Sequence, residues 1–186
     1  MRRILLLPLA VVAVAACGDI ALPAPAYENR VDTVTLYALD GTPVYSPSAY
    51  DLEFRQVVRT DQNTGFDFVF NIDSTGRAVL LPLGALKLGT NLSGIQRTNQ
   101  KFDSITFAPT SGYKLDSAVV VDSNAVALVQ SRPLTCSFQL TTAYYAKLHV
   151  ISIDTTSGPG GRTMKFEILT DINCGYRGLK PGLPPR

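Results

Sequence analysis

A two-residue alternation of apolar and polar side chains restricts the fold of this chain more than any other feature. The alternation is clearest in residues 66–72, where Asp67 and Asn71 separate large apolar residues that would share one face of an extended strand. Those apolar residues are Phe66, Phe68, Phe70 and Ile72. The turn sequence DSTG follows at 73–76, and residues 77–81 return as an apolar run that ends at Pro82. This segment therefore predicts a β-hairpin.

Further segments of the same kind recur between turn sequences. Strands are predicted at residues 31–39, 50–58, 104–107, 115–121, 125–130, 144–153 and 164–170. In the strand at 144–153, Ala146, Leu148 and Val150 share one face, while Lys147 and His149 share an outward, solvated face. Residues 83–100 show no clear period and predict either a loop between sheets or an irregular strand. Together these strands predict an all-β domain over residues 31–176, folded as a single antiparallel sandwich or a partly open barrel.

The first 16 residues differ from the rest of the chain. Two arginines precede an apolar run at 4–16 that ends in small side chains. A membrane-spanning helix needs about twenty apolar residues, and Pro8 interrupts this shorter run, so the run predicts a cleaved helical signal peptide. Residues 17–30 contain two prolines and predict a short tether, and residues 177–186 predict a proline-rich tail.

A cysteine stands directly after the apolar run, in the string VAAC at 14–17. This string resembles the lipobox of bacterial lipoproteins, in which the matching cysteine is lipidated and becomes the mature N-terminus. The resemblance implies that Cys17 is lipidated and that acyl chains hold the protein to a membrane. Ordinary signal-peptide cleavage after the string AVA at 13–15 is the alternative. Gly18 follows the cysteine and Asp19 comes one place later, which favours the outer membrane over the inner membrane.

The other two cysteines, Cys136 and Cys174, are expected to form a disulfide. Thiols in an oxidising compartment outside the cytoplasm usually pair. Neither cysteine belongs to a C-x-x-C motif or has a histidine close by in the sequence, so a metal or catalytic role is the weaker interpretation.

The charge of the processed chain excludes one class of partner. The chain carries a formal net charge of +2, and residues 1–16 hold two of its basic residues, so removing them leaves 15 basic and 15 acidic residues. Nucleic-acid binding requires a clustered basic face, and this neutral balance argues against it. We therefore expect a membrane contact through the N-terminal lipid and no nucleic-acid partner, with the protein or small-molecule ligand unknown.

Catalytic and metal-binding motifs are scarce. His149 is the only histidine, so no zinc ligand set is expected, and we predict no metal site and no cofactor. Four aspartates in turn-like sequences leave calcium as an open alternative, although turn formation explains each of them equally well. These aspartates are Asp61, Asp73, Asp154 and Asp171.

Three carboxylates are candidates for general acid–base chemistry. Asp51 and Glu53, or either of them with Glu167, could form the pair that glycoside hydrolysis needs. The simpler interpretation places Glu53 and Glu167 at polar strand positions, where they are either solvated or paired with Arg55 or Lys165. We therefore predict no catalytic residues.

The strings AYDLEF at 49–54, YAKLHV at 145–150 and MKFE at 164–167 carry a second resemblance. They resemble uncharacterised bacterial lipoproteins whose last hairpin contains a Y-A-K-L strand, a resemblance that covers much of the mature chain and implies no activity. They are more distantly similar to haem-capturing envelope lipoproteins with an all-β core. That family binds haem iron with two histidines, whereas this chain has one.

The sequence thus predicts a lipid-anchored protein of the bacterial cell envelope that presents one all-β domain as a non-enzymatic binding or structural module. Two alternatives remain open: a periplasmic hydrolase that uses Asp51, Glu53 or Glu167, and a carrier that holds a small apolar ligand between its sheets. Two carboxylates converging in a cleft would favour the hydrolase, whereas an enclosed apolar cavity would favour the carrier.

Overall fold

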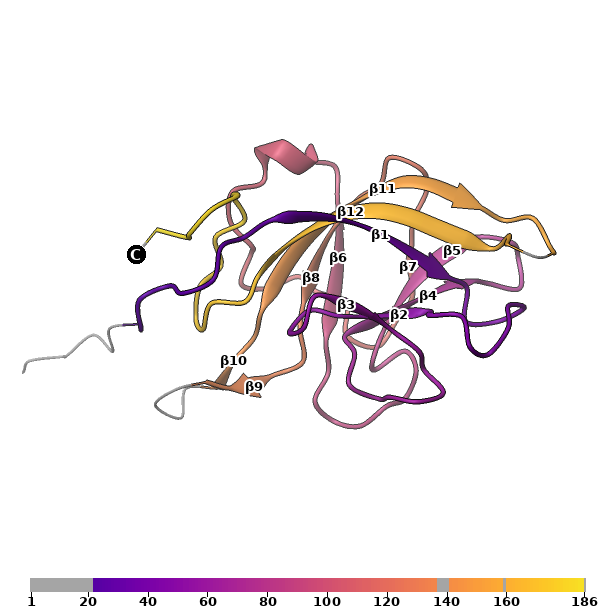
Figure 1. Cartoon of the computed structure of the whole chain (residues 1–186), viewed down its shortest axis with the longest axis horizontal. Helices are drawn as coiled ribbons and strands as arrows, with labels where there is room; N and C mark the ends of the chain where they lie inside the picture. Colours follow the sequence, from indigo (N-terminus) through magenta and orange to yellow (C-terminus); the bar gives the residue numbers. More distant parts are fainter. Residues whose placement is uncertain (1–21, 137–140, 159, 186) are drawn as a thin grey trace, which may run out of the picture.

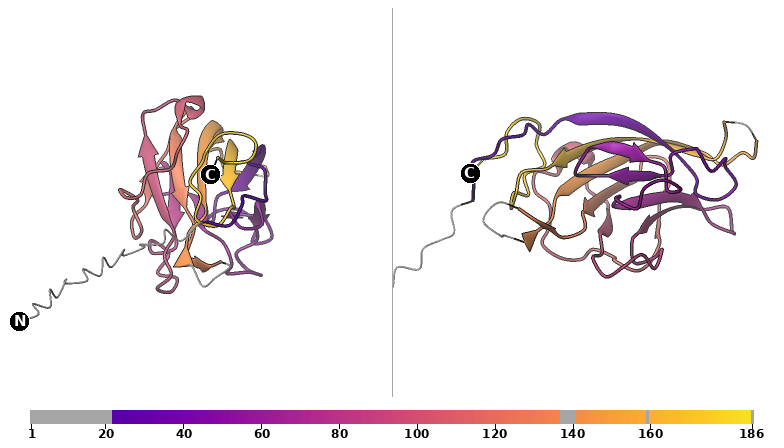
Figure 2. Two further views of the ribbon diagram at one scale, coloured as in Figure 1. Left: turned by 90° about the vertical axis from the view of Figure 1, so that its left-hand side faces the viewer. Right: turned by 60° about the horizontal axis from the view of Figure 1, so that its bottom comes forward.

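A computed structural model of the protein describes residues 22–136, 141–158 and 160–185. In these residues the fold is all-β, with one short 3₁₀ helix and no α-helix. Two five-stranded antiparallel sheets pack face to face as a sandwich (Figures 1 and 2), which is one of the two predicted architectures. The first sheet has the strand order β1-β12-β11-β8-β6 and the second has the order β3-β2-β4-β5-β7. A separate two-stranded unit pairs β9 with β10.

The strands of the first sheet are β1 (Val31–Tyr37), β6 (Gly94–Thr98), β8 (Val126–Gln130), β11 (Tyr145–Asp154) and β12 (Thr163–Asp171). Those of the second sheet are β2 (Ala49–Asp51), β3 (Gln56–Val58), β4 (Phe68–Ile72), β5 (Ala78–Pro82) and β7 (Val119–Val120). The remaining elements are η1 (Phe102–Ser104), β9 (Leu134–Thr135) and β10 (Thr141–Thr142).

The two hairpins predicted most clearly are confirmed. β4 pairs antiparallel with β5, and β11 pairs antiparallel with β12. The register of β11 shifts between Val150 and Ser152, so Ile151 forms a β-bulge. Beyond this bulge the inward positions move by one residue, and Ile153 packs against the core.

Other strand predictions need correction. Residues 50–58 form the hairpin β2–β3 instead of one strand, because the chain reverses at Arg55, whose φ is 52°. Residues 104–107 start at the last residue of η1 and form no strand in the sheets. The ambiguous stretch 83–100 contains β6, and the predicted strand 115–121 is reduced to β7.

Aromatic rings fill the space between the two sheets. Tyr50 and Phe68 from the second sheet meet Phe166 from the first, with ring centroids 5.7–6.1 Å apart. All three side chains are fully buried. Aliphatic residues of β6, β8 and β11 complete this main core. The interior between the sheets is therefore packed with side chains from both layers.

Loops also cover parts of the two outer faces, which the sequence pattern assigns to solvent. On the first sheet, Phe102, Ile105 and Leu179 pack over residues of β8, β11 and β12. Lys147 lies beneath this cover with an exposed fraction of 2%, so its predicted solvation is wrong. On the second sheet, Phe66 and Val69 pack with Leu83 in a separate cluster, so Phe66 does not share the inner face of Phe68.

The two ends of the described chain lie together at one end of the sandwich (Figure 1). The backbones of Asn29 and Gly182 exchange two hydrogen bonds, each of 2.9 Å. Asn29 belongs to the predicted tether and Gly182 to the predicted tail. Both segments are therefore part of the folded domain, although the predicted bounds of 31 and 176 leave them outside it. In the described ranges, no helix is long and apolar enough to cross a bilayer.

Candidate functional site

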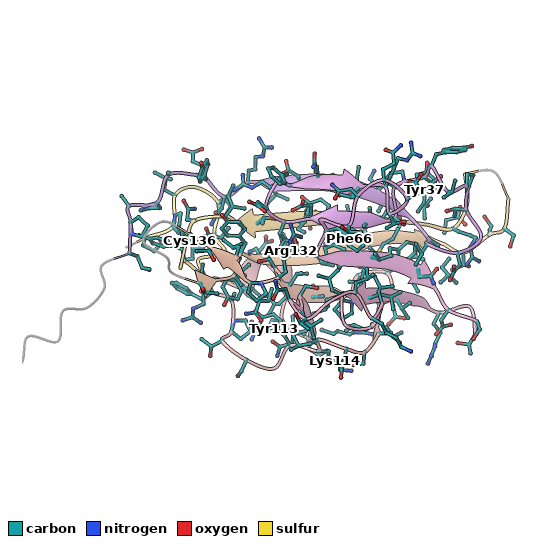
Figure 3. The ribbon with its side chains drawn as sticks, turned by 90° about the horizontal axis from the view of Figure 1, so that it is seen from below. Tyr37, Phe66, Tyr113, Lys114, Arg132 and Cys136 are labelled. Atoms are coloured by element: carbon teal, nitrogen blue, oxygen red, sulfur yellow. A yellow bond between two sulfur atoms is a disulfide. The ribbon has the colours of Figure 1, made fainter. Side chains whose placement is uncertain are left out.

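Arg132 gathers two of the three predicted carboxylates. Its Nη2 lies 3.8 Å from Asp51 Oδ2 and 3.6 Å from Glu53 Oε2, and its Nη1 lies 3.3 Å from Asp67 Oδ1. Arg132 follows β8 of the first sheet, whereas Asp51 ends β2 of the second, so this cluster links the two layers. Figure 3 shows Arg132 in the middle of the molecule. Glu53 thus pairs with Arg132, not with Arg55, and its side chain stays exposed.

The carboxyl groups of this cluster accept hydrogen bonds from the backbone. Asp67 accepts from Leu52 N at 2.8 Å and from Arg132 N at 2.9 Å, and it is fully buried. Burial raises the pKa of Asp67 to about 6, although these hydrogen bonds and the Arg132 charge act to lower it. Asp51, also buried, accepts from the backbone N–H of Glu53 at 2.9 Å. The carboxyl groups of Asp67 and Asp51 are therefore buried and hydrogen-bonded to the backbone, so a substrate has little access to them.

The third predicted carboxylate, Glu167, lies at another place in the fold. It is the cross-strand neighbour of His149 on the outer face of the first sheet, and its Oε1 lies 2.7 Å from His149 Nδ1. Glu167 thus pairs with His149, not with Lys165, and His149 is half-buried, so its predicted solvation needs correction. The structure thus brings Asp51 and Glu53 together and separates Glu167 from them.

An open hollow of about 510 Å³ surrounds the His149–Glu167 pair. It lies on the outer face of the first sheet, beside η1, and its walls come from β6, β8 and the loops before η1 and β8. Polar and charged side chains dominate it: Arg97, Asn99, Gln100, Lys101, Asp103, Asp122, Ser123 and Asn124. Arg97 and Asp122 form an ion pair of 2.9 Å at its rim. Such a surface suits a polar ligand better than an apolar one.

Lys147 stabilises the segment that forms one wall of this hollow. Its ammonium group donates to the backbone oxygens of Phe102 and Ile105 at 2.9 and 3.0 Å. It also lies 4.5 Å from the centre of the Phe102 ring, which allows a cation–π interaction. Burial lowers the pKa of Lys147 from its ordinary value. Phe102 in turn lines the hollow next to His149.

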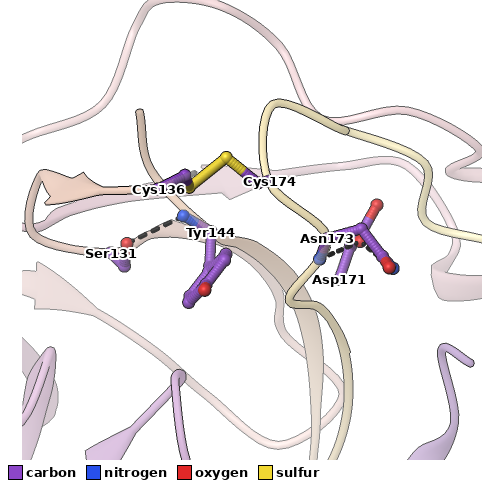
Figure 4. The surroundings of a disulfide bond; sticks show 6 residues. All are labelled: Ser131, Cys136, Tyr144, Asp171, Asn173 and Cys174. Carbon is purple, nitrogen blue, oxygen red and sulfur yellow. Dashed lines mark hydrogen bonds between the residues drawn. A yellow bond between two sulfur atoms is a disulfide. The ribbon is translucent and has the colours of Figure 1, made fainter. Parts of the chain in front are cut away.

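The predicted disulfide between Cys136 and Cys174 is confirmed, with the two Cα atoms 6.0 Å apart. Figure 4 shows it beside Tyr144, whose backbone N–H donates to Ser131 Oγ at 2.8 Å. The bond joins the segment after β9 to the segment after β12. A second open hollow of about 390 Å³ lies here, between the disulfide and residues 23–27.

Turn formation accounts for three of the four aspartates considered for calcium. Asp73, Asp154 and Asp171 each accept a hydrogen bond of 2.8–2.9 Å from the backbone N–H two residues later. Asp61 instead forms an ion pair of 2.7 Å with Arg59. In the part of the chain that the structure describes, no three His, Cys, Asp or Glu residues are grouped so that they could hold a metal ion.

The residues that organise these sites are largely ones that sequence reasoning missed. Arg132 and Asp67 are 65 positions apart, and neither stands in a recognisable motif. Lys147 has the alternating position of an exposed side chain, and the distant 102–105 segment helps to bury it. The cross-strand pairing of His149 with Glu167 could be found from the sequence only with the register of β11 on β12. Predicted lipidation at Cys17 falls outside the described residues.

The chain matches no protein-family model, no curated protein and no solved structure with which it was compared.

Proposed function

We propose that this protein is a lipid-anchored protein of the bacterial cell envelope whose β-sandwich is a non-enzymatic binding or structural module. The observation that carries the proposal is the export signal that ends in VAAC at 14–17. The all-β domain supports it, because Leu22, five positions after Cys17, already packs against Gly175 of that domain. The position of Gly18 after the cysteine favours the outer membrane.

The placement of the carboxylates favours a binding module over the hydrolase. Glycoside hydrolysis uses two carboxyl groups that face each other across the bond to be cleaved, about 5–10 Å apart. Here Asp51 is buried and bonded to backbone N–H groups and Arg132, and Glu167 belongs to a different surface. The three candidates therefore do not line one cleft.

The filled interior favours a binding module over the carrier of an apolar ligand. The rings of Tyr50, Phe68 and Phe166 contact one another across the two sheets. A ligand between the layers would have to displace these side chains. We assign ligand or partner binding to the exterior instead, and the polar hollow around His149 is our candidate surface.

The anchor is tested by phase partition of the protein made in its native host, comparing the wild type with the Cys17→Ser variant. We expect the wild type to enter the detergent phase and the variant to stay in the aqueous phase, because acyl chains supply about 0.8 kcal/mol per buried methylene group. The Cys136→Ser/Cys174→Ser variant is the control: it also lacks cysteines but keeps Cys17, so it should enter the detergent phase like the wild type. Wild-type protein in the aqueous phase would contradict the proposal.

The binding role is tested by crosslinking in intact envelopes. A photo-crosslinker at Gln100, in the hollow, is compared with one at Ser74, on an exposed turn between β4 and β5. We expect a discrete product at Gln100 that the Arg97→Ala variant reduces. Hydrolysis of an envelope glycan that the Glu53→Gln or Glu167→Gln variant abolishes would support the hydrolase instead.

A further inference from the structure

The segment that precedes β1 is fixed to the body of the domain. The side-chain amide of Asn173, buried after β12, accepts from Ala26 N and Tyr27 N at 2.8 and 2.9 Å and donates to Tyr27 O at 2.8 Å. Asn29 donates through its own side chain to Gly178 O at 2.7 Å. Residues 22–30 therefore do not act as a free tether, although their composition predicts one.

Contacts continue to the first residues that the structure describes. The Tyr176 hydroxyl donates to Pro23 O at 2.9 Å. Leu22 packs on Gly175, where an added Cβ would stand 2.5 Å from a Leu22 methyl carbon. Gly175 also has a φ of 81°, which favours glycine. The chain is thus fixed to the domain at Leu22 and Pro23, next to the Cys136–Cys174 disulfide.

The position of Leu22 limits how far the domain can stand from a lipid on Cys17. Five residue steps separate Cys17 from Leu22. An extended chain covers at most about 3.3–3.6 Å per residue, so these steps span no more than about 18 Å. If residues 17–30 were all free, the 13 steps from Cys17 to Arg30 would span about 45 Å. Docking of residues 22–30 thus reduces the largest possible distance between the lipid and the domain from about 45 Å to about 18 Å.

We infer that the terminal pole of the sandwich, defined as residues 22–30, 105–108 and 173–185, faces the membrane and contacts the lipid surface. This inference depends on the proposed lipid anchor at Cys17. The three segments lie against one another through backbone hydrogen bonds, including Ala108 N to Arg177 O and Leu179 N to Thr106 O. In Figure 3, Cys136 marks this end and Tyr37 lies at the other.

The exposed side chains of the terminal pole suit a lipid–water interface. Tyr27, Phe107 and Leu183 have exposed fractions of 58%, 59% and 54%, and Leu22 is also exposed. Aromatic and aliphatic residues with nearby cations are typical of surfaces that rest on lipid headgroups. The described residues of the pole carry three basic side chains, Arg30, Arg177 and Lys180, and one acidic side chain, Glu28.

The opposite end of the sandwich is built from connected loops that would point away from the bilayer. Arg162, in the β11–β12 connection, donates to Asp40 O at 2.9 Å and to Ile72 O at 3.4 Å. β12 runs the length of the sandwich between the two ends, and its nine residues span about 26–30 Å. A label on Ser74, in the β4–β5 turn at this distal end, therefore reports a position far from the terminal pole.

The test places the lipidated full-length protein on vesicles of phosphatidylethanolamine and phosphatidylglycerol that contain a nitroxide headgroup lipid. A fluorophore is attached to the Lys180→Cys or the Ser74→Cys variant, both at exposed positions. We expect quenching at Lys180 to exceed quenching at Ser74 by at least about twofold, because nearly the full length of a strand separates them. Equal quenching, or stronger quenching at Ser74, would overturn the inference.

A second comparison releases the docked segment. In the Asn173→Ala background, we expect the difference between the two labels to fall by at least about half, since the chain from Cys17 to Glu28 can then extend over about 40 Å. Asn91→Ala, at an exposed loop asparagine, is the matched control and should keep the full difference. Asn173→Ala could disrupt the whole fold, which a loss of cooperative unfolding would reveal. In that case the Leu22→Ala/Tyr176→Phe variant replaces it, since this variant removes only the contacts that hold residues 22–25. If the variant that folds keeps the full difference in quenching between the two labels, docking of residues 22–30 does not set the orientation of the domain.

Flotation of the same samples separates the two proposals. Protein that does not float with the vesicles contradicts the lipid anchor. Protein that floats but shows no stronger quenching at Lys180 contradicts only the orientation.

Discussion

Burial of Asp67 makes the stability of the folded protein depend on pH. Its pKa is raised to about 6 in the folded protein, above an ordinary value of 3.8. A carboxyl group of this kind favours the folded state when protonated, so its contribution is complete below about pH 3.8 and is lost as the pH rises through about 6. The raised pKa corresponds to a loss of about 3 kcal/mol over that range.

The Asp67→Asn variant tests this contribution. Both Asp67 oxygens accept from backbone N–H groups, and an amide NH₂ would face one of these donors, so we expect a loss of about 1–3 kcal/mol. Only the wild type loses stability through ionisation of Asp67. The difference in unfolding free energy between the wild type and the Asp67→Asn variant should therefore narrow as the pH rises from about 4 to about 7. Urea unfolding across this range measures it. A gap that widens would mean that the fold lowers the pKa of Asp67.

Lys147 is a second residue whose environment differs from its sequence pattern. Its two carbonyl partners, Phe102 and Ile105, would lose their donor in the Lys147→Met variant. Since a buried group left without its partner costs stability, we expect a loss of about 1–3 kcal/mol in the free energy of unfolding. Lys165→Met, an exposed position on β12, is the control and should change stability by less than about 0.5 kcal/mol. Equal effects of the two substitutions would show that Lys147 does not hold the 102–105 segment.

Among the secondary-structure elements, those that alternate over many residues were the ones that the sequence could predict. β11 and β12 are the longest strands, and their inward residues Leu148 and Phe166 stand where the period places them. The β2–β3 hairpin was missed because its turn contains neither glycine nor proline and reverses at Arg55 instead. Contacts between distant segments, such as Leu179 N with Thr106 O, fix the cover of the first sheet, and no local pattern encodes them.

The disulfide joins the short β9–β10 unit to the end of β12, a strand that the first sheet holds on both sides. β9 and β10 pair through two residue positions, whereas Cys174 follows a nine-residue strand. The bond closes a loop with a sequence separation of 38. On the chain-entropy model, a loop of this length stabilises the folded state by about 4 kcal/mol. We therefore expect the Cys136→Ser/Cys174→Ser variant to lose about 2–4 kcal/mol.

Urea unfolding of the oxidised wild type, the reduced wild type and the double variant measures this contribution. The reduced protein and the variant should agree within about 0.5 kcal/mol, since both lack only the crosslink. A double variant as stable as the oxidised wild type would mean that the disulfide does not constrain the unfolded chain.

For the molecule as a whole, the sequence predicted the layers of the fold better than its sites. The sandwich follows from alternation, which is a local property. The candidate sites depend on pairs from distant strands, such as Arg132 with Asp67 and His149 with Glu167. The docked position of residues 22–30 is also non-local, because Asn173 lies 146 positions after Tyr27. These pairs require the strand order and register, which alternation does not specify.

The proposed attachment to the membrane, and the orientation inferred from it, both depend on acylation at Cys17. Mass spectrometry of the N-terminal peptide of protein isolated from its native envelope tests this modification. We expect the mature chain to begin at Cys17 and to carry fatty acyl groups there. A mature chain that begins at any other residue, or a Cys17 with an unmodified thiol, would contradict both proposals.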